Sequence, residues 1–113
     1  MDILGIDYEI GLENCGDDED IYEVVLETYV EEAIENRDQL LDIRSNDIKN
    51  FTIIAHALKS ANNNIGAVDL GEKFRLLEFA GKDGDASYIE ANVDSVCNEL
   101  TELVDRINEY LEG

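Results

Sequence analysis

The chain has 113 residues, and its 28 acidic residues against 8 basic ones give a formal net charge of −20. Hydrophobic residues make up 44% of it, which is enough for the core of one small domain and too many for a disordered acidic tail. We therefore expect a single domain over residues 1–113. So acidic a surface repels nucleic acid and anionic membranes, which are not expected partners, whereas basic or mixed protein surfaces remain possible.

The sequence contains no targeting or membrane signal that we can identify. No segment approaches the roughly 18 consecutive apolar residues that span a bilayer, and the start of the chain lacks the basic and apolar regions of a signal peptide. We therefore expect a cytoplasmic protein. Cys15 and Cys97 are far apart and form no CxxC pair, so we expect reduced thiols, with Cys97 in the core.

The first part of the chain predicts a short helical turn followed by a long helix. The turn is expected over residues 7–12. The acidic run 17–20 suits a helix N-terminus, and helical spacing of apolar residues then continues to about Ile43. The apolar positions of this first long helix are Ile21, Val24, Val25, Tyr29, Ala33, Leu40 and Leu41.

Three further long helices are predicted, separated by short clusters of Gly, Asp and Asn. They cover about residues 48–65, 67–80 and 86–111, and Asp85 is expected to cap the last of them. The chain contains no proline, and no strand-like alternation competes with the helical pattern. Amphipathic helices joined by short links predict an all-α, up-down-up-down four-helix bundle with a short N-terminal helical turn.

His56 is the only histidine, and its position in the second long helix is informative. At about 100° per residue, it faces directly away from the apolar stripe. A buried structural histidine would lie on or beside that stripe, so this interpretation fails, although an exposed histidine without a role remains possible. The stripe consists of Phe51, Ile54, Leu58, Ala61 and Ile65.

The residues around His56 are small or suited to binding phosphate. Lys59 lies one turn further on, where its charge could neutralise an anionic group attached to the ring. Small neighbours would let a partner surface approach the imidazole closely. The residues expected to contact that partner are Ala55, Ala57, Ser60 and Asn63.

The charge distribution singles out the same region. Residues 56–82 hold four of the eight basic residues and only three acids, a net charge of +1, so the rest of the chain carries −21. If this low number of acidic residues arose by chance, it would also have to coincide by chance with the only histidine. The sequence thus keeps its negative charge away from His56.

One motif runs onward from this histidine. It reads His56-Ala57-Leu58-Lys59-Ser60 and is followed by Gly66-Ala67, Leu77-Glu78 and Gly84-Asp85. This pattern resembles the signature of histidine-containing phosphotransfer domains. The segment 7–12 and the acidic helix after it are also similar to the start of such domains, so the resemblance covers nearly the whole chain.

The resemblance implies a role for each residue of the site. His56 is the phosphoacceptor, Lys59 stabilises the phosphoryl group, and the small Ser60 gives the partner clearance. Several members of the family have a Gln that hydrogen-bonds the imidazole, and Glu78 occupies the matching position. Its carboxylate could orient the imidazole by accepting from a ring N–H, but it would repel a phosphoryl group that came too near.

The implied function is that of a phosphorelay carrier, which accepts a phosphoryl group from a receiver-domain aspartate and passes it to another response regulator. A largely neutral imidazole is a suitable nucleophile. The sequence offers no glycine-rich phosphate loop and no convincing metal cluster, so kinase activity of its own is not expected. No cofactor is expected in this chain, because the resemblance assigns the Mg²⁺ that drives transfer to the receiver domain.

The expected partners are response-regulator receiver domains and a hybrid histidine kinase, and we expect the chain to be a monomer. Docking is expected over the second and third long helices rather than over the acidic first one. One alternative is a non-phosphorylated module that docks to a receiver domain or kinase and inhibits it, but His56 together with Lys59 favours the carrier. The other alternative, a purely structural acidic bundle, predicts neither the motif nor the gap in acidic residues.

Overall fold

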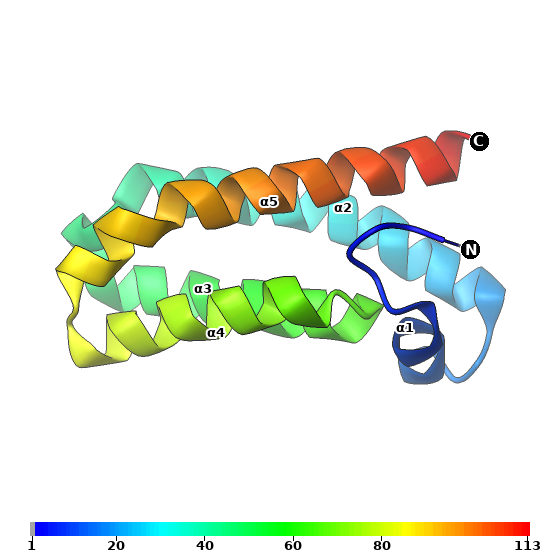
Figure 1. Cartoon of the computed structure of the whole chain (residues 1–113), viewed down its shortest axis with the longest axis horizontal. Coiled ribbons are helices and arrows are strands. Elements are labelled where there is room, and N and C mark those ends of the chain that lie inside the picture. The colour runs from blue at the N-terminus through cyan, green and yellow to red at the C-terminus, as the bar shows by residue number, and fades with distance from the viewer. Residues whose placement is uncertain (1) are drawn as a thin grey trace.

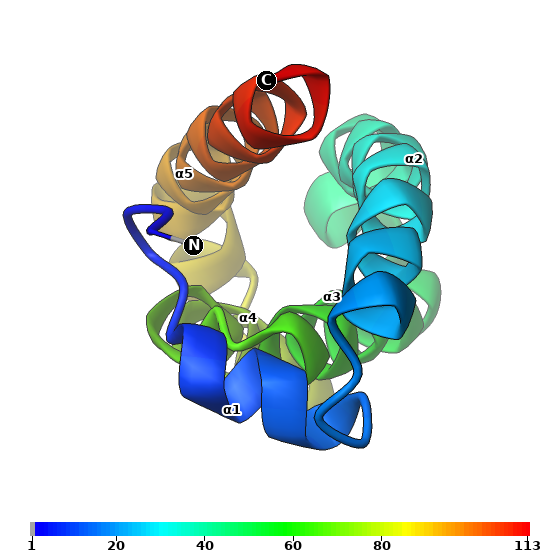
Figure 2. The ribbon, with the colours of Figure 1, turned by 90° about the vertical axis from the view of Figure 1, so that its right-hand side faces the viewer.

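The computed structural model describes residues 2–113, which form five α-helices and one 3₁₀ turn. Figure 1 shows α2 and α5 in one layer and α3 and α4 in the other, with α1 at the end where α2 begins and α3 ends. In the end-on view of Figure 2 the four long helices surround a common core. The elements are α1 (Tyr8–Asn14), α2 (Glu19–Ile43), η1 (Arg44–Asp47), α3 (Ile48–Ile65), α4 (Val68–Asp83) and α5 (Ala86–Glu112).

The predicted all-α, up-down-up-down bundle is confirmed. Helix α2 contacts α3 and α5, and α4 also contacts α3 and α5, so the four helices close into a ring. The interface between α3 and α4 is the most extensive of these. The predicted N-terminal turn is longer than expected, because α1 continues to Asn14, and α4 continues through Gly81 to Asp83.

Aspartate side chains start four of the five α-helices. Each accepts a hydrogen bond from a backbone N–H of the first turn, which would otherwise have no partner. The cap predicted at Asp85 is present and accepts from Tyr88 N at 3.1 Å. The other three caps are Asp7, Asp18 and Asp47.

The buried face of α2 differs from the predicted one. Ile21 and Val24 are 51% and 59% exposed, so their assignment to the core is wrong. The buried stripe instead begins with Tyr22 and Leu26 and then continues through the predicted positions Tyr29, Ala33 and Leu40. Tyr22 and Tyr29 can be buried because each hydroxyl finds a partner inside the protein. Tyr22 donates to the Ile65 carbonyl and Tyr29 donates to the Asn62 side chain, both at 2.7 Å. These bonds satisfy the polar end of each ring and let it enter the core.

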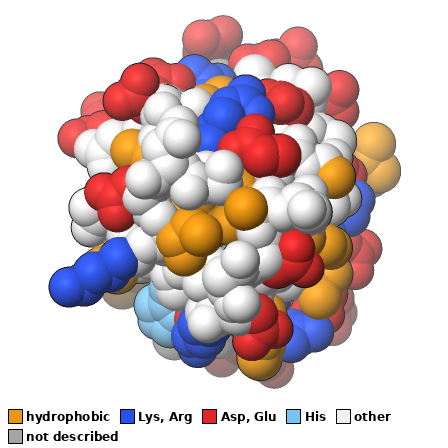
Figure 3. Space-filling model, turned by 90° about the vertical axis from the view of Figure 1, so that its left-hand side faces the viewer, with side chains coloured by type: hydrophobic (Ala, Val, Ile, Leu, Met, Phe, Trp, Pro, Cys, Tyr) orange, Lys and Arg blue, Asp and Glu red, His pale blue; other side chains and the backbone are white. Residues whose placement is uncertain are grey.

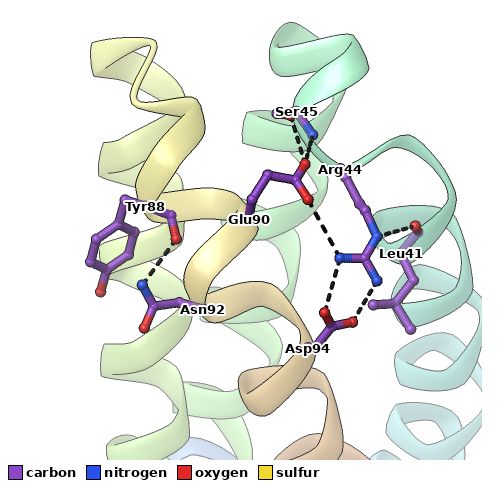
Figure 4. Close-up of polar contacts among 7 residues, drawn as sticks. All are labelled: Leu41, Arg44, Ser45, Tyr88, Glu90, Asn92 and Asp94. Atoms are coloured by element: carbon purple, nitrogen blue, oxygen red, sulfur yellow. Dashed lines mark hydrogen bonds and ion pairs between the residues drawn. The ribbon is translucent and has the colours of Figure 1, made fainter.

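The bundle is closed at the far end from α1 by polar contacts between the α2–α3 connection and α5 (Figure 4). Arg44 donates hydrogen bonds to both carboxylate oxygens of Asp94 and forms an ion pair with Glu90. Glu90 in turn accepts hydrogen bonds from the backbone and the hydroxyl group of Ser45. These contacts join the α2–α3 connection to α5 at this end of the bundle. Cys97, on the same helix α5, is buried as predicted, and both cysteines are free.

Candidate functional site

Helices α3 and α4 approach so closely that two positions of α4 have no room for a side chain. A Cβ atom at Gly71 would overlap the side-chain amide of Asn63, and one at Gly81 would overlap the Thr52 hydroxyl. The two glycines lie on either side of Glu78 along α4. The close approach therefore brings the Glu78 side chain directly against α3.

His56 stands on the outer side of α3, with 57% of its side chain exposed. Figure 3 shows the histidine at the surface, in pale blue, with a basic side chain beside it. Its Nδ1 lies 3.0 Å from Oε2 of Glu78. An ionised carboxylate can only accept a hydrogen bond. Nδ1 therefore carries the proton and donates a hydrogen bond to Glu78. In the neutral ring, Nε2 then keeps its lone pair.

Glu78 is the centre of the polar cluster and is almost fully buried, with 5% of its side chain exposed. Lys59 Nζ lies 3.0 Å from Oε1, and Lys82 Nζ lies 3.2 Å from Oε2. Burial by itself would raise the pKa of the carboxyl group, but the contacts with Lys59, His56 and Lys82 outweigh it and lower the pKa of Glu78 to about 2. Glu78 is therefore ionised at neutral pH despite its burial.

The two oxygens of Glu78 are held differently. Oε2 accepts from the His56 ring, whereas Oε1 has the Lys59 ammonium at 3.0 Å but receives no hydrogen bond of good geometry. Lys59 therefore holds this oxygen through an ion pair. The Lys59 side chain is partly buried, with 24% exposed, and lies one turn along α3 from the imidazole, within reach of a group attached to the ring.

The structure brings some of the predicted site residues together and leaves one of them in the core. His56, Lys59 and Glu78 form one cluster, and the small residues Ala57, Ser60 and Asn63 are exposed on α3. The prediction that Ala55 contacts a partner is wrong, because Ala55 is fully buried in the core. Helix α4 packs against α3 on that side of the imidazole, so the exposed arc of α3 is narrower than the helical wheel alone indicates.

Lys82 belongs to the cluster and was not anticipated from the sequence. It lies four residues after Glu78 on α4, and this spacing brings two side chains together on one face of a helix. The spacing is visible in the sequence and could have identified it. Lys82 and Arg75 both lie over the ring of Phe79, which is 47% exposed, so the surface of α4 beside the histidine is basic and partly apolar.

A groove of about 540 Å³ runs between α2 and α3. Ser60 and Ala61 line it from α3, and Val24, Thr28 and Glu32 line it from α2. The exposed Val24 side chain is thus part of this groove. Ser60 lies one turn from the imidazole and also borders the groove, so a bulky side chain at this position would stand between the ring and an approaching surface.

The described residues contain neither a cluster of metal ligands nor a candidate membrane-spanning helix. Among residues 2–113, no three His, Cys, Asp or Glu side chains are arranged to hold a metal ion. No helix in this part of the chain combines the length and the apolar character needed to cross a membrane.

The chain has the fold of a known phosphotransfer protein. Its structure is similar to the crystal structure of histidine-containing phosphotransfer protein B from Pseudomonas aeruginosa PAO1, with a TM-score of 0.85 over 96% of each chain and 22% sequence identity. No protein-family model matches the chain, and no curated protein does. The resemblance drawn from the motif is thus confirmed at the level of the fold.

Proposed function

We propose that this chain is a phosphorelay carrier, which accepts a phosphoryl group on His56 from a receiver-domain aspartate and passes it to another response regulator. The observation that carries the proposal is the exposed imidazole whose Nδ1 lies 3.0 Å from the buried carboxylate of Glu78. The similarity in fold to a histidine-containing phosphotransfer protein supports it.

The geometry suits a nucleophile that needs little help from its own chain. Glu78 accepts a hydrogen bond from the Nδ1–H group, so the ring is oriented and the lone pair of Nε2 is available to attack phosphorus. Lys59 lies one turn from His56 on α3 and contacts the same carboxylate, so its charge can neutralise the incoming phosphoryl group. A carrier of this kind has no kinase activity of its own.

The partner supplies what this chain lacks. In this proposal the Mg²⁺ and the acidic residues that promote transfer belong to the receiver domain, and the chain binds no cofactor. It acts in the cytoplasm as a monomer that meets receiver domains and a hybrid histidine kinase. The basic side chains of α4 beside His56 favour docking of an acidic active site over α3 and α4.

Transfer of label from phosphorylated receiver domains tests the proposal directly. We expect the chain to become labelled and to pass the label to a second receiver domain, with the bound phosphate labile in acid and stable in base. If the chain binds receiver domains and inhibits them but never takes up label, it is the non-phosphorylated module instead.

Replacing Lys59 with Ala is expected to slow phosphoryl transfer about tenfold, which corresponds to about 1.4 kcal/mol in the activation free energy. The reason is the loss of the cation that faces the phosphoryl group. Stopped-flow or quench-flow transfer rates measure the effect. Lys73→Ala is the matched control, because Lys73 pairs with Glu99 on the opposite side of α4. Equal rates for Lys59→Ala and this control would remove Lys59 from the site.

Replacing Ser60 with Trp is expected to weaken receiver binding and transfer at least about tenfold. Position 60 is exposed beside the imidazole, where an indole ring would hold the two backbones apart without disturbing the core. Titration with a receiver domain, followed by backbone amide shifts, measures binding. Asn98→Trp, at an exposed position on α5, controls for the added bulk. Unchanged binding by Ser60→Trp would contradict the clearance argument.

A further inference from the structure

Phe79 is the one phenylalanine of the chain that lies at the surface. Phe51 and Phe74 are fully buried in the core, whereas Phe79, on α4, is 47% exposed. Contact between water and apolar surface is unfavourable, and a partner that covers the ring removes this cost. Large aromatic side chains are for this reason enriched among the residues that contribute most to binding at protein interfaces.

Two basic side chains of α4 hold the Phe79 ring in place. The guanidinium carbon of Arg75 lies 5.1 Å from the ring centroid, and the ammonium nitrogen of Lys82 lies 5.5 Å from it. Both cations are attracted by the negative face of the ring. These contacts restrict the ring before any partner arrives, so less side-chain entropy is lost when the ring is bound.

The Phe79 ring lies close to the imidazole. Oε2 of Glu78 is 3.0 Å from Nδ1 of His56 and 3.2 Å from Nζ of Lys82. The same ammonium group lies over Phe79. At about 100° per residue, Lys82 and Arg75 are placed between Glu78 and Phe79 around α4. A protein interface of standard size covers about 800 Å² on each partner, so an interface of this size centred on His56 extends over Phe79.

We infer that Phe79 is the anchor by which this chain binds a receiver domain, and that the partner surface which takes the ring is an apolar socket bordered by carboxylates. This inference rests on the proposed carrier function and adds the chemistry that the partner must present. Arg75 and Lys82, which lie over the ring, meet the border of the socket as the ring enters it. A socket bordered by basic residues is repelled by the same two cations, so they also select among partners.

The charges around Phe79 contrast with those of the whole chain, which has a formal net charge of −20. The ion pairs at this surface join three cations to two carboxylates; the cations are Lys59, Arg75 and Lys82, and the carboxylates are Glu72 and Glu78. The pair of Arg75 with Glu72 is exposed, with 41% and 54% of the two side chains accessible. A carboxylate of a partner can therefore compete with Glu72 for the guanidinium. An acidic partner is attracted here and repelled by the more acidic surfaces of the chain.

The test of the anchor measures binding of a receiver domain to Phe79→Ala. The probe is a receiver domain that labels the wild-type chain, and isothermal titration calorimetry gives its dissociation constant. We expect Phe79→Ala to weaken binding at least about tenfold, because the socket is left without the ring that fills it. Tyr110→Ala is the matched control, since it removes an aromatic ring on α5 that is 40% exposed. This control should change the dissociation constant by less than about twofold.

A second pair of variants tests the carboxylates at the border of the socket. Glu72→Gln removes the charged partner of Arg75 and leaves the guanidinium free to bind a carboxylate of the receiver domain. We therefore expect binding to tighten about threefold. Glu99→Gln is the matched control, because it removes one negative charge and the partner of Lys73 on the side of α4 that faces α5. Tightening by Glu72→Gln alone supports the inference, and equal dissociation constants for the two variants would overturn it.

Labelling with the small donor phosphoramidate separates this inference from the carrier function. Phosphoramidate reaches His56 without docking, so Phe79→Ala should take up label from it at the wild-type rate. Wild-type binding of the receiver domain by a folded Phe79→Ala protein overturns the inference and leaves the carrier function intact. Failure of both phosphoramidate and phosphorylated receiver domains to label the wild-type chain overturns the carrier function. Should Phe79→Ala fail to fold, the comparison of Glu72→Gln with Glu99→Gln decides, because neither carboxylate is buried.

Discussion

Replacing His56 with Gln should abolish uptake of phosphoryl label from a receiver domain. The chain has one histidine, and a glutamine amide has no lone pair of comparable nucleophilicity with which to attack phosphorus. The loss should exceed about a thousandfold in the rate of labelling. Gel-based transfer assays with a radiolabelled receiver domain measure it.

The same variant should keep the fold of the wild type. The His56 side chain is mostly exposed, and the Gln amide N–H can donate to Glu78 in place of the ring. Circular dichroism and thermal melting should therefore change little. Label that persists on a correctly folded His56→Gln protein would show that another residue is the acceptor and would remove His56 from the proposed mechanism.

Replacing Gly11 with Ala should destabilise the protein by about 2 kcal/mol or more, which corresponds to a fall in melting temperature of about 10 °C. A Cβ atom there would overlap the carbonyl group of Ile65 and the ring of Tyr22. These groups are already bonded to each other, and a backbone carbonyl at the end of α3 cannot move aside as a flexible side chain would. Helix α1 must therefore shift away from the bundle.

The control for this change is Glu13→Ala, at an exposed position on the same helix. It should alter stability by less than about 0.5 kcal/mol. Chemical denaturation of the two variants measures the difference. If Gly11→Ala were as stable as Glu13→Ala, the packing of α1 against the end of α3 would be looser than the structure indicates.

The sequence predicted most of the fold because its four long helices are strongly patterned and lack proline. It also predicted that His56 faces outward, since that depends only on the angle between residues of one helix. The identity of its carboxylate partner depended on the family resemblance. No local pattern in α3 points to a residue more than twenty positions away on α4.

The errors arose where packing between helices decides the outcome. Ala55 is covered because α4 lies against that side of α3, which the wheel of a single helix does not contain. Ile21 and Val24 are exposed because Tyr22, with its bonded hydroxyl group, and Leu26 occupy the inner face of α2 in their place. Lys82 joins the cluster through its spacing from Glu78 on α4, which the pattern around His56 on α3 does not contain.

The close approach of α3 and α4 has a consequence for the reactivity of the imidazole. Gly71 and Gly81 set the separation of the two helix axes, and a hydrogen bond of 3.0 Å between Nδ1 and Oε2 tolerates an increase of only about 0.5 Å. The preference of the His56 ring for the tautomer protonated at Nδ1 thus depends on the distance between α3 and α4. A partner that wedges α4 away from α3 would release the Nδ1 proton and leave Nε2 free to take it up, which would switch off the nucleophile without touching the ring.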